Sequence, residues 1–118
     1  MLTIKPYDKV VPFQGKSGDI KLQTIVLNNP SVSENIQFEI SSSRLIAKAL
    51  TRRGVLKPRS KIQIELEHCG DNTNNVCFTV TSAPVSSSKF VEWHSMKPTI
   101  QQKSKLTTFV TDHSRRYG

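Results

Sequence analysis

Residues 24–58 read TIVLNNPSVSENIQFEISSSRLIAKALTRRGVLKP, and this stretch decides the fold class. Two runs within it, residues 24–27 and 36–40, are rich in apolar and β-branched side chains, and the second run alternates apolar with polar residues. The Asn-Pro-Ser sequence at 29–31 between them is typical of a turn. Alternation with period two predicts strands that bury one face, so the stretch predicts two neighbouring strands of a sheet.

Similar runs lie on both sides of this stretch, and the clearest is KIQIELE at residues 61–67. Further strands are expected over residues 1–5, 9–13, 19–28, 76–82 and 105–110, and a weaker one over 45–50, which could instead form a helical turn. About seven strands with turn signals between them predict an all-β sandwich. The residues predicted to face its core are Ile36, Phe38, Ile40, Ile62, Ile64, Leu66, Val76, Phe78 and Val80, with Gln37 and Glu39 facing outward.

Three segments depart from simple alternation. Ile20 and Leu22 have one parity and Ile25 and Leu27 the other, which predicts a bulge or a strand that changes sheets. Residues 54–58 are expected to form a turn. Residues 85–100 lack period two, and we expect one helical turn over 88–93, capped by Ser87 or Ser88, that brings Phe90 and Trp93 over one end of the sandwich.

The 118 residues suffice for one domain, and the net charge of +8 is unevenly distributed. Seven basic residues and no acid lie between positions 44 and 61, and a second basic group follows residue 96. Such a surface attracts acidic or phosphorylated peptides, anionic membranes or nucleic acid. The two groups are Arg44, Lys48, Arg52, Arg53, Lys57, Arg59 and Lys61, and Lys97, Lys103, Lys105, Arg115 and Arg116.

Several functional classes are disfavoured by the residues that the sequence lacks. The aromatic residues fall mostly at core positions rather than among the basic ones, so nucleic-acid binding is not expected. The sequence contains no phosphate-binding loop, nucleophile elbow or paired carboxylates, and Asp112, His113 and Ser114 are neighbours in a polar tail. We therefore expect neither an enzyme nor a cofactor.

The two cysteines, Cys69 and Cys77, flank a loop and could form a pair. Reduced thiols are expected, because the sequence shows no leader peptide and no apolar run long enough to span a bilayer, which favours the cytosol. His68 would give three potential zinc ligands, but no fourth is nearby and the spacing fits no common site, so no metal is expected.

Short motifs follow one another in order along nearly the whole chain. They are Leu2-x-Ile4-x-Pro6, Asp19, Ile25-x-Leu27-x-Asn29-Pro30-Ser31, Ile36-x-Phe38-x-Ile40, Gly54-Val55-Leu56-x-Pro58, Ala83-Pro84, Trp93, Lys97-Pro98 and Ser104-Lys105-Leu106. This ordered set resembles the major sperm protein (MSP) domain. The last two motifs are similar to the VAP proteins, the vesicle-associated-membrane-protein-associated proteins of that family.

The resemblance implies a seven-stranded immunoglobulin-like sandwich. In VAP-like members it implies a non-enzymatic adaptor that binds acidic peptides containing phenylalanines, and attachment to the cytosolic face of the endoplasmic reticulum through a tail anchor at membrane contact sites. The nematode sperm members instead polymerise, so a self-assembling structural protein is the alternative. A basic domain that contacts an anionic membrane is a further alternative, which could coexist with peptide binding, and a homodimer could form.

The resemblance also implies a peptide groove that contains Ser42, Ser43 and Lys105. Ser41 stands where the family tends to have lysine, and residues 49–51 stand where it has Val-Arg-Pro, so Arg52 or Lys48 would replace the groove arginine. The expected peptide-binding residues are therefore Ser42, Ser43, Lys48, Arg52 and Lys105. The MSP domain is expected over residues 1–112, followed by a flexible polar tail at 113–118 that would lead to a linker or anchor, and without an anchor the protein would be cytoplasmic.

Overall fold

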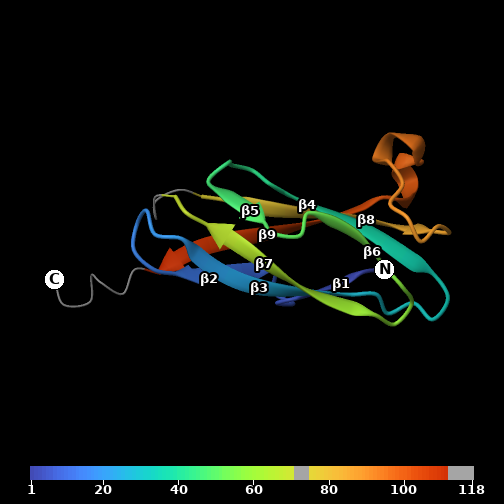
Figure 1. Cartoon of the computed structure of the whole chain (residues 1–118), viewed down its shortest axis with the longest axis horizontal. Helices are drawn as coiled ribbons and strands as arrows, with labels where there is room; N and C mark the ends of the chain where they lie inside the picture. The colour runs from blue at the N-terminus through green and yellow to red at the C-terminus, as the bar shows by residue number, and fades with distance from the viewer. Residues whose placement is uncertain (71–74, 112–118) are drawn as a thin grey trace.

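The computed structural model describes residues 1–70 and 75–111, and it is a sandwich of two β-sheets (Figure 1). Sheet A has the strand order β1-β3-β7-β5, and sheet B has the order β2-β9-β8-β4-β6. Sheet A contains β1 (Thr3–Lys5), β3 (Lys21–Asn28), β5 (Ala47–Ala49) and β7 (Lys61–His68). Sheet B contains β2 (Val10–Gln14), β4 (Asn35–Ser42), β6 (Arg53–Leu56), β8 (Cys77–Val85) and β9 (Gln102–Thr111). The predicted all-β sandwich is confirmed.

The described residues form nine strands rather than seven. One reason lies at the start of the chain, where β1 pairs with β3 in sheet A and β2 pairs with β9 in sheet B. The turn between them is closed by a hydrogen bond from Lys9 N to Pro6 O of 3.0 Å. One edge strand is thereby divided between the two sheets.

The second reason is β6, which occupies part of the segment predicted to be a turn. β6 pairs with β4 from Glu39↔Arg53 to Ile36↔Leu56, and the turn follows it, closed by Ser60 N donating to Lys57 O. Gly54 faces the Phe38 ring so closely that a Cβ atom would lie 3.0 Å from two ring carbons. The glycine therefore serves close packing between two strands and not a chain reversal, and the prediction of a turn at 54–58 was wrong.

β3 pairs with β7 in unbroken register, so the predicted bulge or change of sheet was also wrong. The buried positions of β3 keep one parity and include Lys21, which is 2% exposed. Ile20 and Leu22 lie at exposed positions instead. A lysine can occupy a core position because its apolar stem packs inside while its ammonium group reaches polar partners.

The centre of the sandwich is apolar, as the alternation predicted. All the predicted core residues of β4, β7 and β8 are buried except Ile62, which is half-buried. The preferred short strand within residues 45–50 is confirmed as β5, whose two alanines face the core and which pairs with β7. The β4–β5 connection leaves Leu45 fully exposed.

Residues 86–101, which we call the covering segment, lie against the outer face of β4. The segment contains the 3-10 turns η1 (Trp93–Ser95) and η2 (Pro98–Ile100), so the helical turn comes later than predicted (Figure 1). The side chain of Gln37 exchanges two hydrogen bonds of 2.8 Å with the backbone of Val91. Gln37 is consequently buried, although strand parity predicted it to face solvent.

Candidate functional site

An open groove of about 370 Å³ lies where β4 ends beside β5. Buried alanines of β5 and Ile40 give it an apolar bottom, and the exposed Leu45 gives it an apolar rim. Its charged residues are both basic, which suits an acidic segment that carries an apolar or aromatic side chain. The groove is lined by Ile40, Ser41, Ser42, Leu45, Ala47, Lys48, Ala49 and Arg52.

The two predicted serines hold the start of the β4–β5 connection. The hydroxyl of Ser42 lies 2.8 Å from Arg44 O and 2.6 Å from Ala47 O, so its proton is shared within the connection. The hydroxyl of Ser43 accepts a 3.0 Å hydrogen bond from Cys77 N, and Ser43 N donates to Cys77 O. Because a hydroxyl that accepts one bond keeps its own proton to donate, Ser43 is better placed than Ser42 to bond a ligand.

The two predicted cations of the groove have different surroundings. Lys48 forms a 3.5 Å ion pair with Glu67, and its side chain is 64% exposed, so the pair is a weak restraint. Arg52 is exposed, and none of the residues that the structure describes forms an ion pair with it. Its backbone carbonyl accepts a 2.7 Å hydrogen bond from Ile40 N, which fixes its position beside β4.

Lys105 lies outside the groove, on the outer face of sheet B. It stands opposite Thr79 of β8, which in turn stands opposite Ser41 of β4. With neighbouring strands about 4.8 Å apart, Lys105 and Ser41 are separated by about 10 Å across this row. Ser41 lines the groove and also stands in the row of Ser41, Thr79 and Lys105, so it connects the groove to the outer face of sheet B. Our residue set lacked Ser41, although its outward parity in β4 was visible in the sequence.

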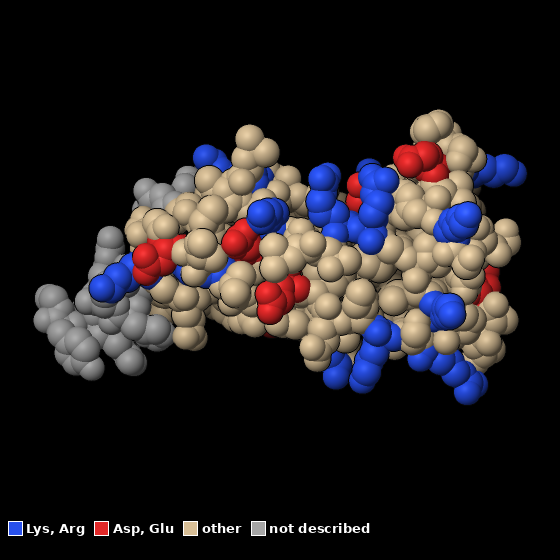
Figure 2. All heavy atoms as spheres, viewed as in Figure 1, with Lys and Arg blue, Asp and Glu red and all other residues tan. Residues whose placement is uncertain are grey.

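The structure therefore brings three of the five predicted residues, Ser42, Lys48 and Arg52, to one groove. Ser43 lies at its margin and Lys105 lies on the adjoining sheet face. Figure 2 shows basic side chains standing out along both long edges of the molecule in this view, with fewer acidic ones between them. Basic side chains therefore outnumber acidic ones on this face of the molecule.

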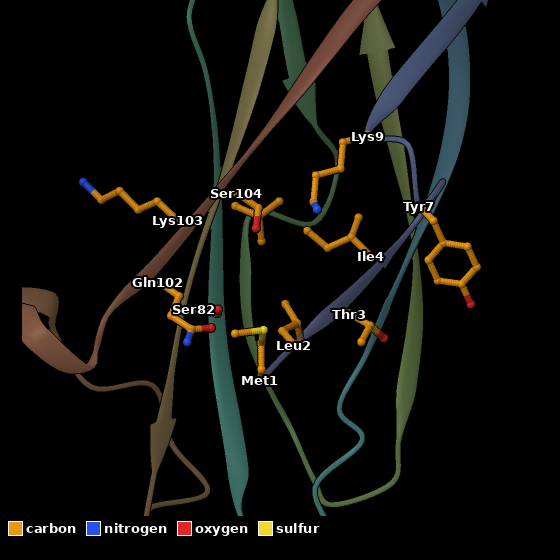
Figure 3. A pocket seen from close by; sticks show the side chains of 11 residues that line it. Met1, Leu2, Thr3, Ile4, Tyr7, Lys9, Ser82, Gln102, Lys103 and Ser104 are labelled. Carbon is orange, nitrogen blue, oxygen red and sulfur yellow. The ribbon is translucent and has the colours of Figure 1, made fainter.

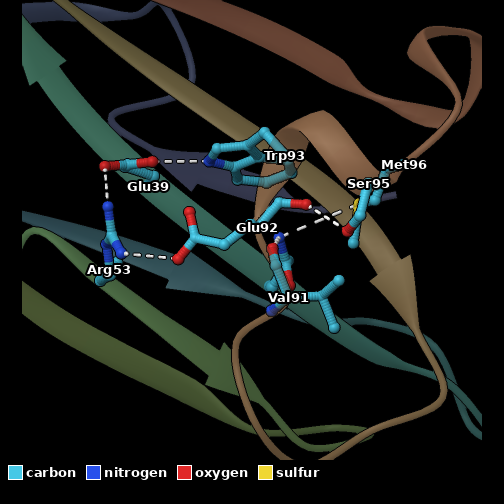
Figure 4. A network of polar contacts seen from close by, with 8 residues as sticks. Glu39, Arg53, Val91, Glu92, Trp93, Ser95 and Met96 are labelled. Carbon is cyan, nitrogen blue, oxygen red and sulfur yellow. Dashed lines mark hydrogen bonds and ion pairs between the residues drawn. The ribbon is translucent and has the colours of Figure 1, made fainter.

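A network of polar contacts fastens the covering segment beside this surface, and the sequence reasoning missed it (Figure 4). Glu39 accepts a 2.6 Å hydrogen bond from Trp93 Nε1 and a 2.8 Å ion-paired bond from Arg53, which also lies 3.6 Å from Glu92. The Arg53 guanidinium lies 4.6 Å from the centre of the Phe90 ring. The signals available in the sequence were the outward parity of Glu39 and the presence of Trp93, which we expected over one end of the sandwich without naming Glu39 as its partner.

Burial by itself would raise the pKa of Glu39. The hydrogen bonds from Arg53 and Trp93, together with the charges of Arg53 and Arg52, outweigh burial and hold the pKa below its usual range. The Arg53 charge is thereby used within the protein. Arg52, one residue earlier in the chain, forms no ion pair with any residue that the structure describes.

A second polar cluster lies inside the sandwich. The Lys21 ammonium donates to the carbonyls of Lys16 and Asp19 at 3.0 and 2.9 Å. His68 is fully buried, and among the described residues its Nε2 atom has no hydrogen-bond partner. Burial and the Lys21 charge lower the pKa of His68, so the imidazole is neutral at physiological pH. Both groups are enclosed, which suits a structural role.

Cys69 and Cys77 are free thiols, and the Cys69 thiol lies 3.3 Å from Ile46 O. Within residues 1–70 and 75–111, no group of His, Cys, Asp and Glu is placed to share a metal ion. None of the helical segments in the same ranges is long and apolar enough to cross a membrane. The tail at 113–118 and the Asp112–Ser114 sequence lie outside the described residues.

No family model and no curated protein matches this sequence. Solved structures do match it, among them WR4, an MSP family member of C. elegans, with a TM-score of 0.73 and 12% identity over 94% of this chain and 98% of that one. SSP-19, an MSP-domain protein-like family member of Caenorhabditis elegans, has a TM-score of 0.69 and 15% identity over 91% of this chain and 98% of that one.

A third match is the ASH or PapD-like domain 7 of human CEP192, with a TM-score of 0.69 and 10% identity over 94% of this chain and 84% of that one. At such identities the likeness shows the fold alone. The MSP-domain fold expected from the motifs is confirmed. The finer likeness to the VAP proteins stays a prediction.

Proposed function

We propose that this domain is a non-enzymatic adaptor that binds short acidic, phenylalanine-containing segments of partner proteins. The observation that carries the proposal is the groove between the end of β4 and β5, where the charged lining residues, Lys48 and Arg52, are both basic and the bottom is apolar. A negatively charged ligand is favoured by this lining, and an aromatic side chain can exclude water from the apolar part.

Each group has a distinct role in this proposal. Arg52 binds the acidic flank of the peptide, because it is exposed and has no ion pair among the described residues. Lys105 extends the positive surface across the outer face of sheet B. Ser41 and Ser43 offer hydroxyl groups to the peptide backbone, whereas Ser42 holds the β4–β5 connection in place. Leu45 and Ile40 contact the aromatic anchor.

The cellular setting that we propose is the cytosolic face of the endoplasmic reticulum, at contacts with other membranes. The support for this setting is the resemblance of the Lys97-Pro98 and Ser104-Lys105-Leu106 motifs to the VAP proteins. It is tested separately from binding, by imaging the tagged native protein in cells with a marker of the endoplasmic reticulum. A uniform cytosolic distribution would contradict the setting without affecting the groove.

Calorimetric titration with an acidic peptide that carries paired phenylalanines tests the binding. Arg52 is the groove cation that forms no ion pair with any described residue, and Arg52→Glu reverses its charge. We expect this variant to bind the peptide at least about tenfold more weakly, as for loss of a charge-assisted contact. Lys61→Glu is the matched control, because it makes the same charge change at an exposed position of β7 outside the groove lining. The control is expected to change affinity by less than about threefold.

A phosphorylated version of the same peptide forms the second arm of the experiment. Tighter binding of this peptide, still lost in Arg52→Glu, would identify the phosphorylated motif as the preferred ligand. If Arg52→Glu and Lys61→Glu weaken peptide binding equally, the effect depends on net charge alone, and binding in the groove is contradicted. If neither peptide binds and sedimentation shows concentration-dependent assembly, the self-assembling structural alternative replaces the adaptor.

A further inference from the structure

β9 has an edge that is only half covered. β2 accompanies β9 in parallel from Val10↔Thr107 onward, and before that point the chain crosses to sheet A through the turn at residues 6–9. No strand of the described residues pairs with this edge of β9 over residues 102–106. The other edge of the same residues is paired with β8.

The direction of the backbone groups on this free edge follows from the covered half. Thr107 N donates to Lys9 O, and Thr111 O accepts from Gly15 N, so odd-numbered residues of β9 direct their backbone groups toward β2. Because backbone groups alternate along a strand, Lys103 and Lys105 direct their N–H and C=O groups to the same side. These groups are available to an additional strand.

A cavity of about 530 Å³ lies beside this free edge (Figure 3). It is bounded by β1 on one side and by the beginning of β9 on the other, and Figure 3 shows Leu2 and Ile4 projecting between these strands. The bottom is formed by Leu2, Ile4 and Val80, which are all buried. The cavity and the free edge have one cause, since β1 pairs with β3 and leaves the place beside β9 empty.

The charges at the cavity mouth indicate what could enter. Lys9 and Lys103 line the cavity, and no acidic residue is among the residues that line it. In Figure 3 the side chain of Lys9 extends toward the cavity, while Lys103 projects to the outer side of β9. Lys103 and Lys105 have the same parity in β9, so both stand on the outer face of sheet B, next to any strand that pairs with this edge.

We propose that an extended segment of a partner protein, with alternating acidic and apolar residues, adds to β9 at residues 102–106 as a further strand of sheet B. Its backbone pairs with the N–H and C=O groups of Lys103 and Lys105. Its acidic side chains stand beside these lysines on the outer face, where opposite charges on neighbouring strands attract. Its apolar side chains enter the cavity and contact Leu2 and Ile4.

The same charges disfavour a second copy of this chain as the occupant. Two copies of β9 paired edge to edge would bring Lys103 and Lys105 next to their own counterparts, and like charges on neighbouring strands repel. The proposed site also differs from the groove at β5, since the two share no lining residue. Lys105 contributes its charge to both proposals, but the edge backbone of β9 and the cavity beside β1 belong to the strand-addition site alone.

Nuclear magnetic resonance on the isotope-labelled domain tests the proposal with a short capped peptide of alternating glutamate and valine. At saturation we expect hydrogen exchange of the Lys103 and Lys105 amides to slow at least about tenfold, because these N–H groups become paired in a ladder. The same peptide with N-methyl groups on alternate residues, prepared in both registers, is the matched ligand control. One of the two registers is expected to lose binding, because its methyl groups replace the donors that face β9.

Two variants at one position separate backbone pairing from charge. Lys103→Pro removes the edge N–H together with the charge, while Lys103→Gln removes the charge and keeps the N–H. Proline is tolerated where the N–H of an edge strand is unpaired. We expect about tenfold weaker peptide binding in Lys103→Pro and about threefold weaker binding in Lys103→Gln.

The following results would overturn the proposal. One is unchanged amide exchange at Lys103 and Lys105 at millimolar peptide, and another is equal affinity for the peptide and both N-methylated forms. A third is perturbation of resonances confined to the groove around Arg52, which would place the peptide there. If Lys103→Pro does not fold, the two N-methylated peptides decide the question on the unaltered domain.

Discussion

Lys21 and His68 stand directly opposite each other in the antiparallel ladder of β3 and β7, and both side chains are buried. They meet at Gly70, whose carbonyl lies 3.4 Å from Lys21 Nζ and whose N–H lies 3.4 Å from His68 Nδ1. The rings of Phe13 and His68 have centroids 5.5 Å apart. A buried polar cluster thus joins the start of β3 to the end of β7.

Replacing Lys21 should destabilise the fold. In Lys21→Met the stem is kept, but the carbonyls of Lys16, Asp19 and Gly70 lose a charged donor. We expect the free energy of unfolding to fall by about 2–3 kcal/mol, which is typical of leaving buried polar groups unpaired. Urea denaturation followed by circular dichroism measures it. Lys16→Met, at an exposed position, is the control and should stay within about 0.5 kcal/mol of the parent. Equal effects would show that Lys21 acts only as a surface charge.

The stability of the domain should depend on pH through His68. Burial and the nearby Lys21 charge lower its pKa in the folded state. As pH falls below about 6.5, the unfolded chain takes up the proton first, so the free energy of unfolding decreases by at most about 1.4 kcal/mol per pH unit. Urea titrations between pH 7.5 and pH 5.5, about one unit on either side of this value, measure the slope.

Two histidine variants assign this slope. We expect His68→Phe to remove it and His94→Phe to leave it, because His94 is exposed. If His94→Phe removes the slope, the pH dependence of stability comes from His94, and the assignment to His68 is contradicted.

The hydrogen bonds and ion pair of Glu39 should stabilise the fold more than those of an ordinary surface acid do. Trp93→Phe removes the indole donor and keeps an aromatic ring, and we expect about 1 kcal/mol less stability at pH 7. Because the pKa of Glu39 is lowered in the folded state, its contribution is present above its unfolded pKa of about 4.5 and is lost as pH falls through the folded value.

Acid titration of unfolding in Glu39→Gln measures the contribution of Glu39. The exposed Glu34→Gln serves as the control. An acid-induced loss of stability that is the same in both variants would contradict the assignment.

Gly54 should be intolerant of even one added carbon. Gly54→Ala places a Cβ atom 3.0 Å from the Phe38 ring, and the ring is enclosed in the core, so we expect a loss of about 1–3 kcal/mol. The cost should shrink in a Phe38→Leu background, where the smaller side chain leaves room. A double-mutant cycle from urea unfolding measures this coupling. Additive losses would mean that the close approach of these residues does not restrain the fold.

Much of the fold could be predicted because alternation directly reflects burial. In β4, β7 and β8 the predicted apolar residues alternate with polar ones, and the core encloses all of them except Ile62, which is half-buried. The predictions failed where a polar side chain is buried. Lys21 occupies a core position because the backbone carbonyls of Lys16, Asp19 and Gly70 bond its ammonium group, and alternation does not show where carbonyls point. Gln37 is covered because Val91, which is distant in sequence, bonds to it.

The candidate site could be predicted only in part for a related reason. The basic content of residues 44–61 identified the region, and charge is a property that a sequence shows directly. Whether a hydroxyl is free depends on the three-dimensional course of the chain, and Ser42 is used by the connection that it begins. Arg52 and Arg53 are adjacent in sequence, yet only Arg53 meets Glu39, because β6 pairs it with that residue.

Trp93 is the single tryptophan of the chain, and its indole fastens the covering segment to Glu39 of β4. The protein therefore carries an intrinsic optical probe at one defined point of its surface. Detachment of residues 86–101 would expose the indole to water and shift its emission to longer wavelength, while the two sheets remain folded. A change in this signal without a change in circular dichroism would reveal a local opening that measurements of global unfolding miss.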